Sequence, residues 1–275
     1  DYKLGDRIGR SGVEETYERS LKGTDGAEVI EVDAQGAPTR VLKAVAPVPG
    51  QNVYLSIDAK LQKQSYQALK TGVERVGSCC GAVVGEDPMT GQVAVLASYP
   101  SYDPNVFTDP SKSSGISTII NDPDSPLLNR AIAGVYPPGS TFKIATALAG
   151  LASGKITAQT LIEDTGIMAL GPYTFANWYF TEYGRKEGLV DIIKGLQRSN
   201  DIFFYRAAEL TGVENISSLA HQFGLGDKFG IDLDGEGKGT VPSPSWKEDA
   251  IGEPWYLGDT YNYGIGQGYL LTTPL

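Results

Sequence analysis

Runs of apolar residues predict the strands of this chain. Gly81–Gly85 and Val93–Ala97 flank the turn Asp87–Gly91, which predicts a β-hairpin. Both runs are almost continuously apolar, so we expect central strands that are buried on both faces. Residues 53–57 are a further strand candidate, and residues 1–50 predict a small, extended, mostly β region.

Apolar residues at helical spacing predict the helices. Asp58 is placed to be the N-cap of the first helix, and Gly154 and Gly224 end two later ones. We therefore expect helices at residues 58–70, 140–152, 189–196, 201–210 and 215–223.

The order of these elements predicts the fold class. Helices lie between hairpin strands and cluster in the second half, which favours a mixed α/β (α+β) domain with a mainly antiparallel sheet flanked by helices. Residues 101–126 and 230–260 are expected to be loop-rich. Val45–Gly50 has the composition of a linker, so we divide the chain into a small region, residues 1–50, and a large domain, residues 51–275.

Composition excludes several kinds of partner. The formal net charge of −10 repels nucleic-acid phosphates, so we expect no nucleic-acid partner. The chain has one histidine, His221, and no spaced cysteine pair, so we expect no zinc or iron site. No apolar run reaches membrane-spanning length and no signal peptide opens the chain, while both ends look cut, so we expect it to belong to a longer protein.

The two cysteines, Cys79 and Cys80, are adjacent. Neighbouring cysteines rarely form a disulfide because the geometry is strained. We therefore predict two small strand residues that face opposite sides.

Ser140 and Lys143 are the first candidates for chemistry. Ser140 follows Pro137-Pro-Gly139 and opens a helix, where unpaired N–H groups can stabilise negative charge. Lys143 lies one turn along on the same face, and a desolvated lysine can take the proton of a serine. The alternative is that Ser140 is a helix cap and Lys143 a surface residue, because the pattern S-x-x-K is short.

The surroundings of this pair resemble a known family. Asn129–Ile144 is similar to the nucleophile segment of the class B penicillin-binding proteins, and further segments resemble that family in the same order along the chain. These segments are Gly5–Gly12 with Glu14 and Tyr17, Gly81–Leu96, Tyr99–Asn105 and Gly264–Tyr269. The resemblance implies a transpeptidase domain of the penicillin-binding and serine β-lactamase type, with residues 1–50 as the end of a β-rich pedestal.

The family uses three motifs: S-x-x-K, an S-x-N type and K-T-G. Ser199-Asn200-Asp201 matches the second, with Asp in third place as in the elongation-type branch. By resemblance, Ser199 passes a proton between Lys143 and the leaving amine, and Asp201 binds Lys143 or the substrate. The alternative is a helix cap. Asn200 and the run Gly266, Gln267 and Gly268 are expected to bind substrate.

The third motif departs from the family pattern. Lys70-Thr71-Gly72 precedes Ser140 and ends a helix pattern, so we treat it as unrelated to the site. The family's motif is expected beyond Leu275, on a strand that binds the substrate carboxylate and completes the oxyanion hole.

The resemblance implies a monofunctional peptidoglycan D,D-transpeptidase. Ser140 would form an acyl-enzyme with the D-Ala-D-Ala end of a stem peptide, a neighbouring amine would resolve it, and β-lactams would trap it. Expected partners are a glycosyltransferase and membrane proteins of cell elongation. The implied location is the extracytoplasmic, periplasmic side of the cell membrane, with a single anchor upstream of Asp1.

Two other classes remain open. Ser-Thr-Phe-Lys also occurs in class D β-lactamases and β-lactam sensor domains, although their second motif ends in an apolar residue rather than Asp201. The third class is an inactive scaffold that binds partners through residues 1–50.

The expected position of the third motif gives a first prediction. The 275-residue chain alone should acylate with a labelled penicillin slowly or not at all, whereas the longer protein should acylate readily at Ser140. Labelling followed by gel analysis measures both rates. Normal acylation of the chain alone would contradict the expectation.

Overall fold

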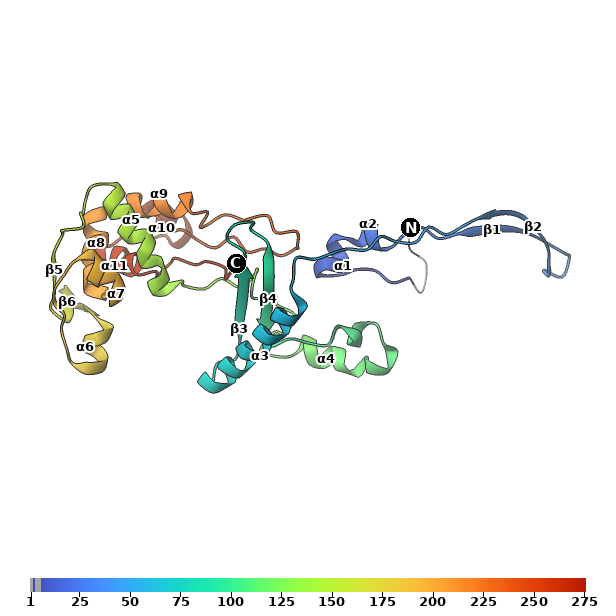
Figure 1. The fold of residues 1–275 in the computed structure, drawn as a ribbon, viewed down its shortest axis with the longest axis horizontal. Helices are drawn as coiled ribbons and strands as arrows, with labels where there is room; N and C mark the ends of the chain where they lie inside the picture. The colour runs from blue at the N-terminus through green and yellow to red at the C-terminus, as the bar shows by residue number, and fades with distance from the viewer. Residues whose placement is uncertain (1, 3–5) are drawn as a thin grey trace.

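The computed structural model describes residue 2 and residues 6–275. A thin arm lies at one end, a hairpin with two neighbouring helices lies in the middle, and a helical lobe forms the other end (Figure 1). The strands are β1 Ala27–Val32, β2 Pro38–Val45, β3 Gly81–Glu86, β4 Val93–Tyr99, β5 Ile162–Asp164, β6 Ile167–Leu170, β7 Tyr173–Ala176 and β8 Gly188–Val190.

Most helices lie in the lobe at the far end from the arm. The α-helices are α1 Gly12–Thr16, α2 Glu18–Leu21, α3 Ala59–Val76, α4 Ser114–Ile120, α5 Lys143–Ala152, α6 Trp178–Tyr183, α7 Ile192–Gln197, α8 Asp201–Thr211, α9 Val213–Gln222, α10 Pro244–Ile251 and α11 Leu257–Gly264. Short 3-10 helices are η1 Pro104–Phe107, η2 Pro110–Lys112 and η3 Gly139–Phe142.

The mixed fold class and the antiparallel pairing are confirmed, but the strands do not form one sheet. The described residues contain separate two-stranded sheets: β1–β2, β3–β4, β5–β8 and β6–β7. The prediction of a strand at residues 53–57 is wrong, because these residues form no strand. That segment lies along β4 and is tied to it by Ser56 Oγ, which donates to the Val93 carbonyl, and by Asp58 N, which donates to the Ala94 carbonyl.

The hairpin β3–β4 is confirmed, with Val83 opposite Ala97. The Asp87 carboxylate accepts from Met89 N and closes the turn. The prediction that both faces of the hairpin are buried is wrong. Helix α3 packs on the two strands, but most of their residues are only partly buried. Asp58 caps α3 as predicted, accepting from Leu61 N at 2.8 Å.

The cysteine prediction is wrong. Cys79 and Cys80 lie in the turn between α3 and β3, not on a strand, and a disulfide joins them. The α3 helix ends at Gly77, whose φ of 68° reverses the chain. On a strand, adjacent side chains would point to opposite faces. In a turn the two cysteine side chains are not held apart in this way.

Several predicted loops contain short helices. Residues 101–126 include η1, η2 and α4, and residues 230–260 include α10 and the first residues of α11. Asp103 and Asp109 start the two 3-10 helices by accepting from backbone N–H groups, each before a proline. The helix predicted at residues 189–196 begins at Ile192, after β8.

The region of residues 1–50 is extended, and its longest elements are the strands β1 and β2. The short helices α1 and α2, which were not predicted, precede them. Among the described residues, the Tyr17 hydroxyl bonds to the Asp232 carboxylate and links this region to the large domain. Gly5, the first residue of the predicted pedestal segment, lies outside the described residues.

Helix α8 is the centre of the lobe. Phe203, Phe204, Ala207 and Ala208 are all fully buried, as expected for a helix that is surrounded by other elements. Helices α5, α9 and α11 pack around it. Phe142 stacks on Tyr263 of α11 with ring centroids 5.3 Å apart, which joins the segment around Ser140 to this core.

The contact between α8 and α11 allows a test of packing. A Cβ added at Gly264 would lie 2.4 Å from the Ala208 Cβ, so Gly264→Ala should destabilise the chain by about 1–3 kcal/mol. Thermal unfolding should show a Tm several degrees lower.

Gly72→Ala is the matched control. Gly72 lies inside α3, and an added Cβ there meets nothing within 4 Å. Because alanine is the better helix former, this variant should be stabilised by about 0.5–1 kcal/mol. Equal Tm values for the two variants would refute the packing argument.

Candidate active site

Ser140 lies in η3, which continues into α5. Gly139 precedes it with a φ of 60°, a conformation that favours glycine. The Ser140 side chain is exposed, and within the described residues its hydroxyl caps neither helix and makes no hydrogen bond. The alternative of a simple helix cap is therefore not supported, and the hydroxyl is accessible to a ligand.

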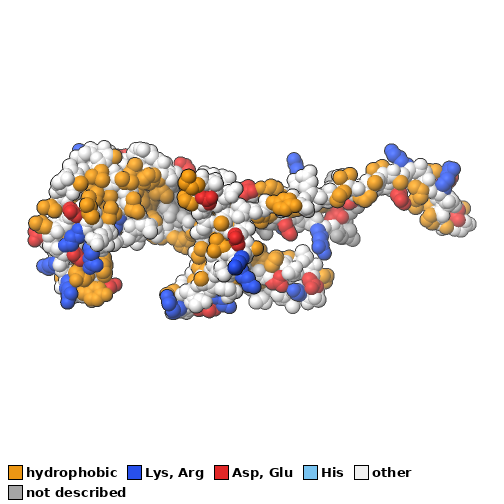
Figure 2. Space-filling model, viewed as in Figure 1, with side chains coloured by type: hydrophobic (Ala, Val, Ile, Leu, Met, Phe, Trp, Pro, Cys, Tyr) orange, Lys and Arg blue, Asp and Glu red, His pale blue; other side chains and the backbone are white. Residues whose placement is uncertain are grey.

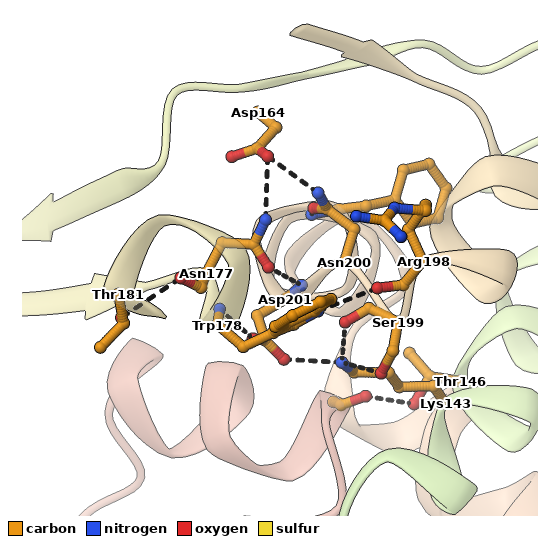
Figure 3. A network of polar contacts seen from close by, with 12 residues as sticks. Lys143, Thr146, Asp164, Asn177, Trp178, Thr181, Arg198, Ser199, Asn200 and Asp201 are labelled. Carbon is orange, nitrogen blue, oxygen red and sulfur yellow. Dashed lines mark hydrogen bonds and ion pairs between the residues drawn. The ribbon is translucent and has the colours of Figure 1, made fainter. Parts of the chain in front are cut away.

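Lys143 is not a surface residue, because its exposed fraction is 1%. Its Nζ donates to Asp201 Oδ1 at 2.6 Å, to the Ser199 carbonyl at 2.8 Å and to Ser199 Oγ at 3.1 Å (Figure 3). Burial lowers the pKa of Lys143, and the neighbouring Asp201 charge offsets only part of that fall. The neutral amine is thus more accessible than in an ordinary lysine.

The segment Ser199-Asn200-Asp201 precedes and opens α8. Asn200 is the cap, because its Oδ1 accepts from Phe203 N at 2.8 Å. Ser199 and Asp201 bind Lys143 instead, so the cap alternative applies only to the middle residue. Ser199 has a φ of 50°, which is uncommon for a residue with a side chain and turns its polar atoms toward Lys143.

The expectation that Asn200 binds substrate is contradicted by its position. Its exposed fraction is 0%, and its Nδ2 donates to Asp164 Oδ2 at 2.9 Å. Both ends of the amide are therefore used inside the protein.

Gly266, Gln267 and Gly268 form the turn after α11, against the nucleophile segment. Gly139 N donates to the Gly266 carbonyl at 2.8 Å, and a Cβ on Gly266 would lie 2.1 Å from the Gly139 carbonyl oxygen. The Gln267 side chain is exposed, and its Nε2 lies 3.5 Å from where a Cβ on Gly139 would be. The turn therefore borders the site, with Gln267 as its polar side chain.

Three residues near the site, Asp164, Asn177 and Trp178, were not predicted from the sequence. Asp201 Oδ2 accepts from Trp178 N at 3.0 Å, and Asp201 N donates to Asn177 Oδ1 at 3.2 Å. Asn177 Nδ2 donates to Asp164 Oδ2 at 2.9 Å (Figure 3). Asp164 and Asn177 look like ordinary turn residues in the sequence, and only the folded chain reveals that both are buried.

The residues set aside in the sequence lie elsewhere in the fold. Lys70 is on α3, beside Glu74 at 3.9 Å, and His221 is an exposed residue of α9. No cluster that could hold a metal ion occurs among the residues that the structure describes. No helix in the described part is long and apolar enough to cross a membrane.

The geometry suits acyl transfer. An exposed serine lies at the start of the helix that carries a buried lysine, and a second serine is bonded to that lysine. This arrangement defines a serine–lysine site, in which the amine replaces the imidazole of a histidine-based triad.

The chain belongs to the penicillin-binding proteins. Residues 81–275 match the family model of the penicillin-binding protein transpeptidase domain. Residues 1–55 match the model of the penicillin-binding protein dimerisation domain.

The chain is 40% identical to the peptidoglycan D,D-transpeptidase MrdA of Escherichia coli over 277 residues, which cover 100% of this chain and 42% of that protein. It is 37% identical to MrdA of Haemophilus influenzae, covering 98% of this chain and 40% of that protein. The chain thus spans about two-fifths of the length of these curated relatives.

Two solved structures are similar along nearly the whole chain. Pseudomonas aeruginosa PBP2 in complex with WCK 5153 has a TM-score of 0.77 and 36% identity, covering 97% of this chain and 54% of the other. The complex between PBP2 and MreC from Helicobacter pylori has a TM-score of 0.83 and 30% identity, covering 97% of this chain and 48% of the other.

The contrast between two buried lysines gives a prediction. Lys247 has an exposed fraction of 2%, yet its pKa is raised: burial lowers it, but the hydrogen bond and charge of Asp259 outweigh that effect. In Asp201→Asn, Lys143 loses the charge that raises its pKa, so its pKa should fall further while that of Lys247 stays constant.

NMR titration of lysine labelled with 13C at Cε measures both values, and the loss of one signal in Lys143→Met assigns Lys143. An unchanged or higher Lys143 pKa in Asp201→Asn would contradict the assigned pairing.

Proposed function

We propose that the protein containing this chain is a peptidoglycan D,D-transpeptidase of the monofunctional, elongation type. The observation that carries the proposal is the buried Lys143, bonded to Ser199 and Asp201 beside an exposed Ser140. The names of the relatives support it, since those from Escherichia coli and Haemophilus influenzae are peptidoglycan D,D-transpeptidases.

The first half-reaction forms an acyl-enzyme. Neutral Lys143 takes the proton of Ser140 Oγ, which attacks the carbonyl of the penultimate D-alanine of a stem peptide. The first-turn N–H groups of η3 and α5 favour the developing oxyanion. The C–N bond then breaks, and Ser199 passes the proton from Lys143 to the leaving D-alanine amine. Asp201 keeps Lys143 in place for this transfer.

The second half-reaction forms the cross-link. An amine of a neighbouring stem peptide attacks the Ser140 ester, a new C–N bond forms, and Ser140 regains its proton through the same lysine. A β-lactam acylates Ser140 in the same way, but its leaving group stays attached, so the ester persists. No step requires a metal or a cofactor.

The remaining expectations are also part of the proposal. We infer that residues 1–50 belong to a pedestal and residues 51–275 to the transpeptidase domain. Gln267 faces the substrate, while the backbone of Gly266 and Gly268 shapes the turn behind it. The domain works on the extracytoplasmic side of a membrane that holds an N-terminal anchor.

The proposed partners are a glycosyltransferase and membrane proteins of the elongation machinery. One similar structure contains MreC bound to PBP2 from Helicobacter pylori. Another, with 32% identity and a TM-score of 0.81, concerns the coordination of polymerisation and crosslinking by a peptidoglycan synthase complex.

A β-lactamase is the main competing activity. The position of Asp201 argues against it, because its carboxylate is bonded to Lys143 and Trp178 N, where the β-lactamase and sensor classes have an apolar residue. The lifetime of the acyl-enzyme separates these classes: hydrolysis within seconds indicates a β-lactamase, and persistence for many minutes a transpeptidase.

The activity test uses the protein that contains this chain. Wild type should be labelled by a fluorescent penicillin and should release D-alanine from a stem peptide, and Ser140→Ala should abolish both. Lys143→Ala should slow acylation by about 10²–10⁴-fold, the usual contribution of a general base.

Lys247→Ala is the matched control, because Lys247 is equally buried but pairs with Asp259 on α11. If both lysine variants lose acylation to the same extent, the loss reflects folding and the role of Lys143 is refuted.

A further inference from the structure

Asp164, at the end of β5, is a buried carboxylate to which the proposed mechanism gives no task. Its exposed fraction is 2%, and no ion pair to it occurs among the described residues. Its oxygens accept four hydrogen bonds from neutral donors: Gly166 N at 2.7 Å, Asn177 Nδ2 and Asn200 Nδ2 at 2.9 Å, and Glu187 N at 3.0 Å. A buried charge without a cation needs such a full set of donors.

Two of the four donors are side chains that lead to the site. Asn177 and Asn200 both point their NH₂ groups at Asp164 Oδ2 (Figure 3). A carboxylate can only accept, so it determines which end of each amide faces it. The carbonyl oxygens of both side chains must then face the start of α8, and each accepts a backbone N–H there.

These oxygens hold the segment that contacts Lys143. Asn177 Oδ1 accepts from Asp201 N, and the next residue, Trp178, donates its backbone N–H to Asp201 Oδ2. Asn200 Oδ1 caps α8 through Phe203 N, immediately after Ser199 with its φ of 50°. The Asp201 carboxylate is fixed in this way with Oδ1 on Lys143 Nζ.

We propose that Asp164 is a positioning residue for the active site. It orients Asn177 and Asn200, and through them it holds Ser199 and Asp201 against Lys143. Asp164 itself does not reach the ligand, because its carboxylate is enclosed by its four donors. The proposal rests on the proposed function only for its effect on acylation; the effect on Lys143 is independent of it.

Asp164→Asn tests the proposal in the protein that contains this chain. The new amide keeps the size of the side chain, but its NH₂ group would face the NH₂ groups of Asn177 and Asn200, with which it cannot form hydrogen bonds. The two asparagine amides therefore lose their fixed orientation. Asp201 should then withdraw from Lys143. The expected results are a lower Lys143 pKa by NMR titration, as in Asp201→Asn, and acylation by a fluorescent penicillin about 10- to 100-fold slower.

Asp191→Asn is the matched control. Asp191 caps α7 in the same lobe by accepting from Lys194 N at 2.8 Å, and asparagine caps equally well. Acylation and the Lys143 pKa should equal those of wild type. The Lys247 signal reports folding in every variant, because its pair with Asp259 lies outside this network.

Asn177→Ala covers the case in which Asp164→Asn does not fold. This variant removes one of the two asparagine side chains that link Asp164 to Asp201, so it should also lower the pKa of Lys143. A folded variant whose Lys143 titrates as in wild type overturns the proposal, even if acylation is slow. If wild type is not labelled at Ser140, the proposed function fails, while the NMR comparison still decides whether Asp164 positions Asp201.

Discussion

The removal of the Lys143 amine from water is the constraint on which the site depends. An isolated ammonium group is expensive to bury, so its position requires acceptors of fixed geometry. The Asp201 carboxylate and two oxygens of Ser199 supply them. Because its pKa is lower in the folded chain than in the unfolded one, the folded chain binds fewer protons at this lysine between the two values. Its contribution to stability therefore rises with pH in that interval.

Lys143 and its acceptors come from separate parts of the chain. Lys143 begins α5, and the two residues that bind it flank the N-cap of α8, so the packing of these helices sets the distance between the Lys143 amine and its acceptors. The β5–β8 pair, the loop before α6 and the start of α8 meet at Asp164. The arm at the other end contributes little to this geometry, and exposed apolar side chains line it (Figure 2).

The sequence was sufficient for the elements with strong turn or cap signals and for the residues that meet at Lys143. Strong turn and cap signals, such as Asp58 and the Asp87 turn, correctly located α3 and the β3–β4 hairpin. The two 3-10 helices η1 and η2 were missed because aspartate caps and prolines, rather than apolar periodicity, define their starts. The role of Asn200 was misjudged for another reason. Whether an asparagine faces a ligand or an interior carboxylate depends on Asp164, 36 residues earlier, and no local pattern encodes that contact.

The close approach of Gly139 and Gly266 limits how this site can evolve. Each lies in a left-handed conformation, and any side chain on Gly266 would collide with the carbonyl of Gly139. The backbone beside Ser140 therefore has almost no tolerance for substitution at these two positions. Side-chain variation in this turn that leaves the backbone beside Ser140 in place is therefore confined to outward-facing residues such as Gln267.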